Sequence, residues 1–89
     1  MKSIHLIISG KVQGVFFRDT TRRKANELGL VGYVKNIPDG DVEVVAQGNE
    51  DKIKELISFI KNNPGYSKVK DVKMKNRKME NFNGFEIKY

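Results

Sequence analysis

Short stretches in which apolar and polar residues alternate recur along the chain, and this two-residue period is that of a strand with one buried face. Ile4, Leu6 and Ile8 share one side of the first stretch. The pattern predicts five strands, at about residues 3–9, 30–37, 41–47, 69–74 and 85–89. Lysines on the outward side of the fourth strand indicate an exposed sheet edge, because charged side chains discourage pairing with another chain.

Two segments between these strands have the 3.6-residue period of amphipathic helices. The first runs from Asp19 to about Leu28 and stops before Gly29, a residue type suited to helix C-termini. In the second, apolar residues recur at i, i+3, i+4 and i+7, namely Ile53, Leu56, Ile57 and Ile60. Asn49 is a suitable N-cap for this helix, and Asn63-Pro64-Gly65 predicts its end.

The predicted elements follow the order β-α-β-β-α-β-β. Pro38-Asp39-Gly40 is a tight-turn sequence, so the second and third strands form an antiparallel hairpin. Two helices on one face of an antiparallel sheet form a ferredoxin-like α/β sandwich of the α+β class. With 89 residues and no internal repeat or linker, we expect residues 1–89 to make a single domain.

The composition narrows the classes of partner. A formal net charge of +6 favours anionic partners such as phosphorylated small molecules or nucleic acid. The absence of cysteine excludes disulfides, zinc–thiolate sites and a cysteine nucleophile, and fits the cytoplasmic location that we expect. Apolar runs reach only three residues and the N-terminus lacks the pattern of a secretory signal, so no membrane association is expected.

The stretch Gly10-Lys11-Val12-Gln13-Gly14-Val15-Phe16-Phe17-Arg18 joins the first strand to the first helix. Its glycines allow the backbone to curl, so that N–H groups point inward, and a helix start adds unpaired N–H groups and the positive end of the helix dipole. Arg18 lies where its guanidinium can bind a phosphate. From the glycine spacing alone, a plain tight turn explains the stretch equally well. It matches neither the Walker pattern nor the dinucleotide-binding pattern.

This stretch resembles the signature of the acylphosphatase family at every defining position, and we call it the signature loop. A second family signature follows in the expected order: Gly32-Tyr33-Val34-Lys35-Asn36, then Gly40, Val42 and Gly48. The resemblance covers essentially the whole chain. It implies hydrolysis of the carboxyl–phosphate bond of acyl phosphates to a carboxylate and inorganic phosphate.

The resemblance also implies roles for particular residues. Arg18 and the backbone N–H groups of the signature loop, Lys11, Val12, Gln13, Gly14, Val15, Phe16, Phe17 and Arg18, are expected to bind the substrate phosphate. Asn36 is expected to orient the attacking water. No metal, cofactor or phosphoenzyme is implied. We expect a monomer that acts on a small acyl phosphate and is inhibited by inorganic phosphate.

These roles make physical sense because an acyl phosphate already has a stabilised carboxylate as its leaving group. The protein therefore mainly positions the phosphoryl group and stabilises charge on its oxygens. Asn36 is neutral and cannot act as a strong base. Lys11 is either a contributor of positive potential or a solvated loop residue. Gln13 either braces the loop through its amide or is simply exposed.

Two other functions are compatible with parts of the sequence. An RNA-binding sandwich would fit the basic charge, but it needs aromatic side chains on its central strands, and residues 41–47 contain none. We therefore expect no nucleic-acid partner. A regulatory or maturation domain that has lost turnover would fit the fold, since related domains occur inside larger carbamoyl-transfer proteins. The intact Arg18 and Asn36 favour an active enzyme.

Overall fold

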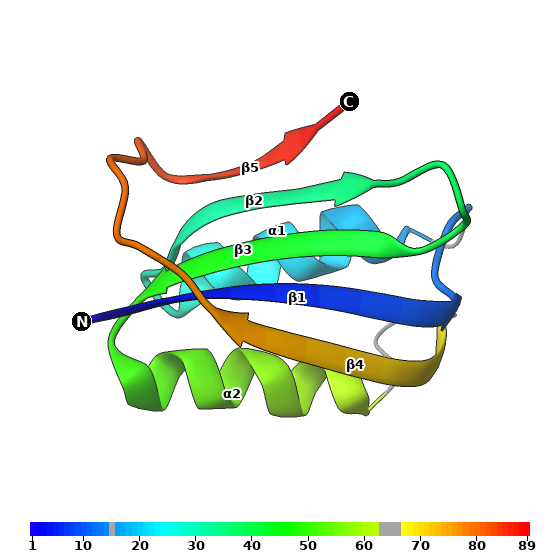
Figure 1. Cartoon of the computed structure of the whole chain (residues 1–89), viewed down its shortest axis with the longest axis horizontal. Coiled ribbons are helices and arrows are strands. Elements are labelled where there is room, and N and C mark those ends of the chain that lie inside the picture. Colours follow the sequence, from blue (N-terminus) through cyan, green and yellow to red (C-terminus); the bar gives the residue numbers. More distant parts are fainter. Residues whose placement is uncertain (15, 63–66) are drawn as a thin grey trace.

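Five strands form one sheet that carries both helices on one face (Figure 1). The computed structural model describes residues 1–14, 16–62 and 67–89. The elements are β1 (Lys2–Lys11), α1 (Phe17–Glu27), β2 (Val31–Asn36), β3 (Val42–Gly48), α2 (Glu50–Lys61), β4 (Lys68–Asn76) and β5 (Phe85–Lys88). This is the predicted ferredoxin-like sandwich with the predicted order of elements.

The sheet has the strand order β4-β1-β3-β2-β5 and is mixed rather than wholly antiparallel. The pairs β1–β3, β1–β4 and β2–β3 are antiparallel, but β5 runs parallel to β2. The expectation of a purely antiparallel sheet was therefore wrong at this edge. The cause is the segment 77–84, which crosses one end of the sheet and starts β5 at the end where β2 also starts (Figure 1).

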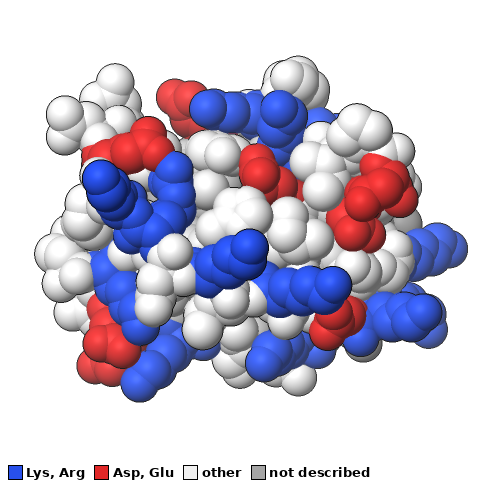
Figure 2. Space-filling model, in the orientation of Figure 1, with Lys and Arg blue, Asp and Glu red and all other residues white. Residues whose placement is uncertain are grey.

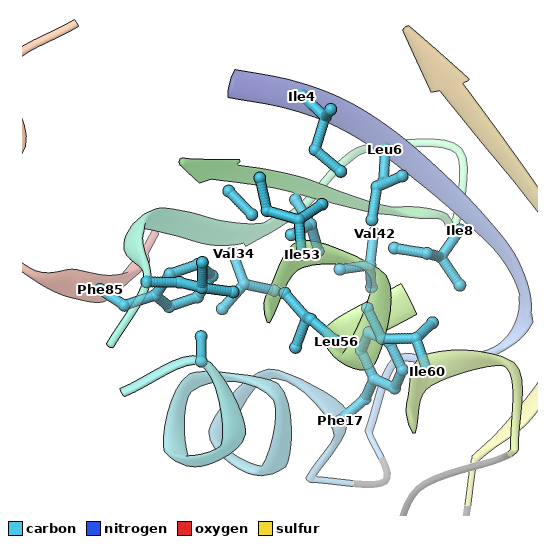
Figure 3. Packing of buried hydrophobic residues seen from close by; sticks show 14 of the residues in the cluster. Ile4, Leu6, Ile8, Phe17, Val34, Val42, Ile53, Leu56, Ile60 and Phe85 are labelled. Atoms are coloured by element: carbon cyan, nitrogen blue, oxygen red, sulfur yellow. The ribbon is translucent and has the colours of Figure 1, made fainter. Parts of the chain in front are cut away.

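The core lies between the sheet and the two helices. Alternate residues of β1, β2 and β3 face inward, and their side chains meet those of α1 and α2 (Figure 3). The largest buried side chains here are Ile4, Leu6, Ile8, Phe17, Leu30, Leu56 and Ile60. Because Phe17 begins α1 and is only 1% exposed, core packing anchors the first turn of that helix.

Some boundaries and orientations differ from the sequence-based expectations. Helix α1 begins at Phe17 instead of Asp19, because the buried Phe17 belongs to its first turn. Met74 is on the inward side of β4 but remains 54% exposed, since β4 is an edge strand. Asn49 caps α2 as predicted, while the predicted stop at Asn63-Pro64-Gly65 lies outside the described residues.

Strand β1 contacts β4 through an irregular register. The pairing shifts between Ser9 and Gly10, where Gly10 has φ 125°. A Cβ at Gly10 would collide with the carbonyl oxygen of Lys68 and lie 2.7 Å from the backbone nitrogen of Lys70. The close approach therefore requires glycine, and it places the start of the signature loop directly on β4.

The segment 77–84 is fastened to the face of the sheet that has no helices. The side chain of Gln47 accepts a hydrogen bond from the backbone N–H of Glu80 at 3.0 Å and donates to its carbonyl at 2.8 Å. The Phe82 ring packs edge-on against Tyr33, with centroids 6.4 Å apart. These contacts hold the crossing segment in place and so fix the position of β5.

Candidate active site

The signature loop leaves β1 and enters α1 through two residues with left-handed backbone. Gly14 has φ 72° and Phe16 has φ 61°, a conformation that is uncommon for a residue with a side chain. A Cβ at Gly14 would meet no atom within 4 Å, so glycine serves the backbone angle there and not close packing. Val15 lies outside the described residues. Left-handed residues of this kind occur in loops whose N–H groups converge on an anion.

The N-terminus of α1 has no side-chain cap. Phe16 occupies the N-cap position, and its side chain accepts no hydrogen bond and is 76% exposed. The carbonyl of Phe16 accepts the backbone N–H of Thr20 at 3.0 Å and the Thr20 hydroxyl at 2.9 Å. Since a helix leaves its first N–H groups without intrahelical partners, those of Phe17, Arg18 and Asp19 are available to an anion.

Arg18 differs from the other arginines of α1 in its contacts. Arg22 donates to one oxygen of the Asp19 carboxylate at 2.6 Å, and Nε of Arg23 lies 3.0 Å from the other. Among the described residues, no ion pair involves Arg18. Its Cζ lies 5.2 Å from the centroid of the Tyr89 ring, a cation–π distance. The guanidinium therefore keeps donors free.

The same pairing determines the charge of Asp19. The hydrogen bond from Arg22 lowers the pKa of this carboxyl, the charges of Arg23 and Arg22 act in the same direction, and partial desolvation opposes them. Asp19 is therefore ionised at neutral pH. Its charge is balanced by two guanidinium groups on the side chains of α1, which leaves Arg18 as the cation of this turn with no carboxylate partner in the described chain.

Asn36 is the last residue of β2 and lies on the same face of the strand as the buried Val34. Its Oδ1 is buried and has no hydrogen-bond partner within the described part of the chain. In the parallel register Val34 is opposite Ile87, so Asn36, two residues later, is level with Tyr89. An unpaired buried carbonyl oxygen costs about 1–3 kcal/mol, which makes Asn36 a candidate for contact with water or substrate.

Gln13 connects the loop to the hairpin that follows Asn36. Its Nε2 donates to the carbonyl oxygen of Ile37 at 3.0 Å and to that of Asp41 at 2.9 Å. Of the two interpretations of Gln13 that the sequence left open, the structure shows the bracing one. Lys11 is exposed at the end of β1 and forms no ion pair within the described residues.

A cavity of about 390 Å³ opens where the loop, α1 and β5 meet. It is lined by Val12, Gly14, Phe16, Phe17, Arg18, Asp19, Ile87 and Tyr89. Five predicted loop residues therefore share one cavity, whereas Lys11, Gln13 and Asn36 do not line it. Sequence analysis missed the contributions of Asp19, Ile87 and Tyr89. The alternation in residues 85–89 predicts that Phe85, Ile87 and Tyr89 share one face of a strand. It does not predict which element that face contacts.

A second polar cluster lies on the open face of the sheet. Nε2 of His5 lies 2.9 Å from Oε2 of Glu43. Burial raises the pKa of the Glu43 carboxyl, but hydrogen bonds from His5 and Tyr33, together with the charges of His5 and Lys35, outweigh it and place that pKa below its ordinary value. His5 thus has a structural partner. Within residues 1–14, 16–62 and 67–89, no three acidic or histidine side chains gather as metal ligands would.

The fold is a ferredoxin-like sandwich with the signature loop at its first strand-to-helix junction. The family model described as Acylphosphatase matches residues 4–87. The chain is 44% identical over 89 residues to the acylphosphatase of Archaeoglobus fulgidus, covering 100% of both chains. The chain belongs to the acylphosphatase family.

Solved structures agree with this assignment. The acylphosphatase from Bacillus subtilis superposes with a TM-score of 0.95 at 37% identity and 100% coverage of both chains. Full-length HypF in its phosphate- and nucleotide-bound form gives a TM-score of 0.92 at 28% identity. That match covers 99% of this chain but 12% of HypF. The same domain fold therefore also occurs within a much longer protein.

Membership in this family establishes the reaction class. The enzyme is a hydrolase that acts on acid anhydrides, and small-molecule acyl phosphates are its substrates. None of the helices in the described residues combines the length and apolar character needed to cross a membrane.

Proposed function

We propose that the signature loop Gly10–Arg18 binds the phosphoryl group of an acyl phosphate and that Asn36 orients the attacking water. The observation that carries this proposal is the uncapped N-terminus of α1 next to an unpaired guanidinium. The first three residues of α1 line this cavity, so the free N–H groups and the positive end of the helix dipole lie beside it. A doubly or singly charged phosphoryl group matches this donor set in charge and geometry.

The reaction places few demands on the protein. The water oxygen forms a bond to phosphorus while the bond from phosphorus to the acyl oxygen breaks, and the carboxylate leaves with its electron pair. Charge on the equatorial oxygens is stabilised by the Arg18 guanidinium and the loop N–H groups. The unpaired Oδ1 of Asn36 accepts a hydrogen bond from the water and directs its lone pair. The water proton passes to an oxygen of the substrate phosphate.

Several further features belong to this proposal. A guanidinium and backbone donors supply the positive charge, so the reaction proceeds without a metal ion, a cofactor or a phosphoenzyme. The enzyme acts as a single domain and a monomer in the cytoplasm. Strand β3, at the centre of the sheet, has no aromatic side chain, and its neighbours β1 and β2 carry only His5 and Tyr33 for stacking bases. On the visible face basic side chains are interrupted by acidic and neutral ones (Figure 2), which favours a small substrate over nucleic acid.

The test is phosphate release from benzoyl phosphate and acetyl phosphate in the presence of EDTA. We expect hydrolysis well above the spontaneous rate, with competitive inhibition by inorganic phosphate. A folded protein with no hydrolysis above background would overturn the catalytic proposal and would favour a regulatory or maturation domain. Activity restored only by added Mg²⁺ would overturn metal independence. Non-competitive inhibition would contradict phosphate binding in the loop.

A further inference from the structure

Gln13 is bonded to the hairpin after Asn36 and not to its own loop. Its amide nitrogen donates to the carbonyl of Ile37 at 3.0 Å and to that of Asp41 at 2.9 Å. An amide NH₂ group has two N–H donors, and both are used by these bonds. The side chain of Gln13 therefore has no donor left for a phosphate, and Gln13 does not line the cavity.

The turn that receives Gln13 is closed by its own hydrogen bonds. The N–H of Ile37 donates to the carbonyl of Asp41 at 3.0 Å, and the N–H of Gly40 donates to the carbonyl of Ile37 at 3.1 Å. The Asp39 carboxylate accepts the N–H of Asp41 at 3.1 Å. These three bonds join residues 37–41 to one another. Its displacement would carry Asn36, the residue next to Ile37.

We propose that Gln13 is a positioning residue that sets the place of Asn36 relative to the signature loop. The proposal rests on the function proposed above. The loop supplies the phosphate donors from β1 and α1, whereas Asn36 comes from β2, which does not pair with β1. The side chain of Gln13 joins these two parts across 24 residues of sequence. In-line attack needs the water and the phosphate in a fixed relation, and an error of 1 Å costs about 100-fold in rate.

The test compares two glutamines that make the same kind of contact. Gln13→Met keeps the length of the side chain but removes both donors. Gln47→Met is the matched control, because Gln47 also makes two hydrogen bonds to backbone, but with Glu80 in the crossing segment 77–84. We expect both variants to lower Tm by several degrees. Only Gln13→Met should lower kcat, by about 10- to 100-fold, with the inhibition constant of phosphate changed less than about twofold.

A double-mutant cycle with Asn36→Ala tests whether Gln13 affects kcat through Asn36. If Gln13 acts through Asn36, Gln13→Met lowers kcat in the native background and changes it by less than about twofold in the Asn36→Ala background. An equal loss in both backgrounds would overturn the proposal. So would an unchanged kcat in Gln13→Met, or a loss of phosphate affinity as large as the loss of kcat, which would assign Gln13 to phosphate binding.

A measurement without turnover separates this proposal from the function on which it rests. Amide hydrogen exchange at Ile37 and Gly40 should be faster in Gln13→Met than in the native protein, and unchanged in Gln47→Met. A native protein that fails to hydrolyse acyl phosphates would refute the proposed catalysis, whereas unchanged exchange at these amides would refute the role of Gln13.

Discussion

The two helices of this protein begin in opposite ways. Helix α2 has Asn49 as its N-cap, whose Oδ1 accepts the N–H of Asp51 at 2.8 Å from an extended backbone. Glu50 and Asp51 add negative charge to its first turn, and this charge interacts favourably with the positive end of the helix dipole. Helix α1 has Phe16 at the same position, with a left-handed backbone and no side-chain hydrogen bond.

The start of α2 therefore serves the stability of the fold, whereas we propose that the start of α1 serves ligand binding. At α2 the protein's own side chains satisfy the helix start. At α1 the cap is missing, a left-handed non-glycine residue costs about 1–2 kcal/mol, and the acidic residue of the first turn, Asp19, is held by Arg22 and Arg23. If the proposed anion binds there, it supplies the acceptor that the start of α1 lacks. Four of the following predictions test the two helix starts directly, and one tests Asn36, the partner of the α1 site.

The largest effect is expected from Arg18→Ala. Removal of the unpaired guanidinium should lower kcat/KM for benzoyl phosphate by about 1,000-fold or more, because charge-assisted bonds to the transition state are lost. Arg23→Ala is the control on the same helix, since Arg23 is already paired with Asp19 and its side chain is 76% exposed. Steady-state kinetics should show the control within about twofold of the native enzyme. Similar losses in both variants would mean that general positive charge, and not Arg18, is what matters.

The second-largest effect is expected from Asn36→Ala. Loss of one preorganised polar group is expected to reduce kcat by about 100- to 1,000-fold while KM changes little. Asn83→Ala, an exposed asparagine in the crossing segment 77–84, serves as the control. An Asn36 variant with native kcat would show that water is oriented by another group.

Asp19→Asn tests whether the acidic residue of α1 opposes anion binding. Its carboxylate lines the cavity, so the substitution should lower the inhibition constant of phosphate by about two- to fivefold. Arg22 and Arg23 lower the pKa of Asp19, so the carboxylate stays ionised and the difference should persist from pH 8 down to about pH 5. Asp51→Asn, in the first turn of α2, should leave the inhibition constant unchanged. A weaker phosphate affinity in Asp19→Asn would show that the Arg22–Asp19–Arg23 cluster organises the site.

Asn49→Ala should lower the stability of the protein and leave catalysis unchanged. Loss of the N-cap bond to Asp51 is expected to lower the free energy of unfolding by about 1 kcal/mol, measured by urea denaturation. The value of kcat/KM should stay within experimental error. A catalytic defect would mean that the start of α2 communicates with the cavity.

The smallest effect concerns the backbone of Phe16. Phe16→Asn should raise the free energy of unfolding by about 0.5–1 kcal/mol, because asparagine tolerates the left-handed region and the phenyl ring is largely exposed. The same denaturation experiment measures it. A destabilised variant would indicate that the ring contributes packing that offsets the backbone strain.

Much of the fold was predictable because its signals are local. Alternation located the strands, the i, i+3, i+4, i+7 pattern located α2, and Asn49 was identified as its cap. The parallel placement of β5 was not predictable from these signals. Alternation says which face of a strand is apolar but not which strand lies beside it, and that choice depends on the path of 77–84 and on contacts such as Gln47 with Glu80.

The features of the candidate site also fall into those that local sequence signals predict and those that they do not. The signature loop and Asn36 could be predicted as site residues because their residue types and spacing lie within short segments. The start of α1 at Phe17, the pairing of Asp19 and the contact of Tyr89 with Arg18 were missed. Each depends on the folded structure: the burial of the Phe17 ring, the pairing of Arg22 and Arg23 with the Asp19 carboxylate, and the position of the edge strand β5 beside β2. The spacing of residues along the sequence does not predict these tertiary contacts.

The close contact of Gly10 with β4 has a consequence for the order of folding. The loop–hairpin contact of Gln13 joins segments 24 residues apart, whereas β1 and β4 pair residues near opposite ends of the sequence, such as Ile4 with Asn76. Long-range pairing must overcome a larger loss of chain entropy, so we expect it to form late. The signature loop leaves β1 at the point where Gly10 lies on Lys68 and Lys70. During refolding, catalytic activity should therefore return with the slowest structural phase, after most of the helical signal has recovered.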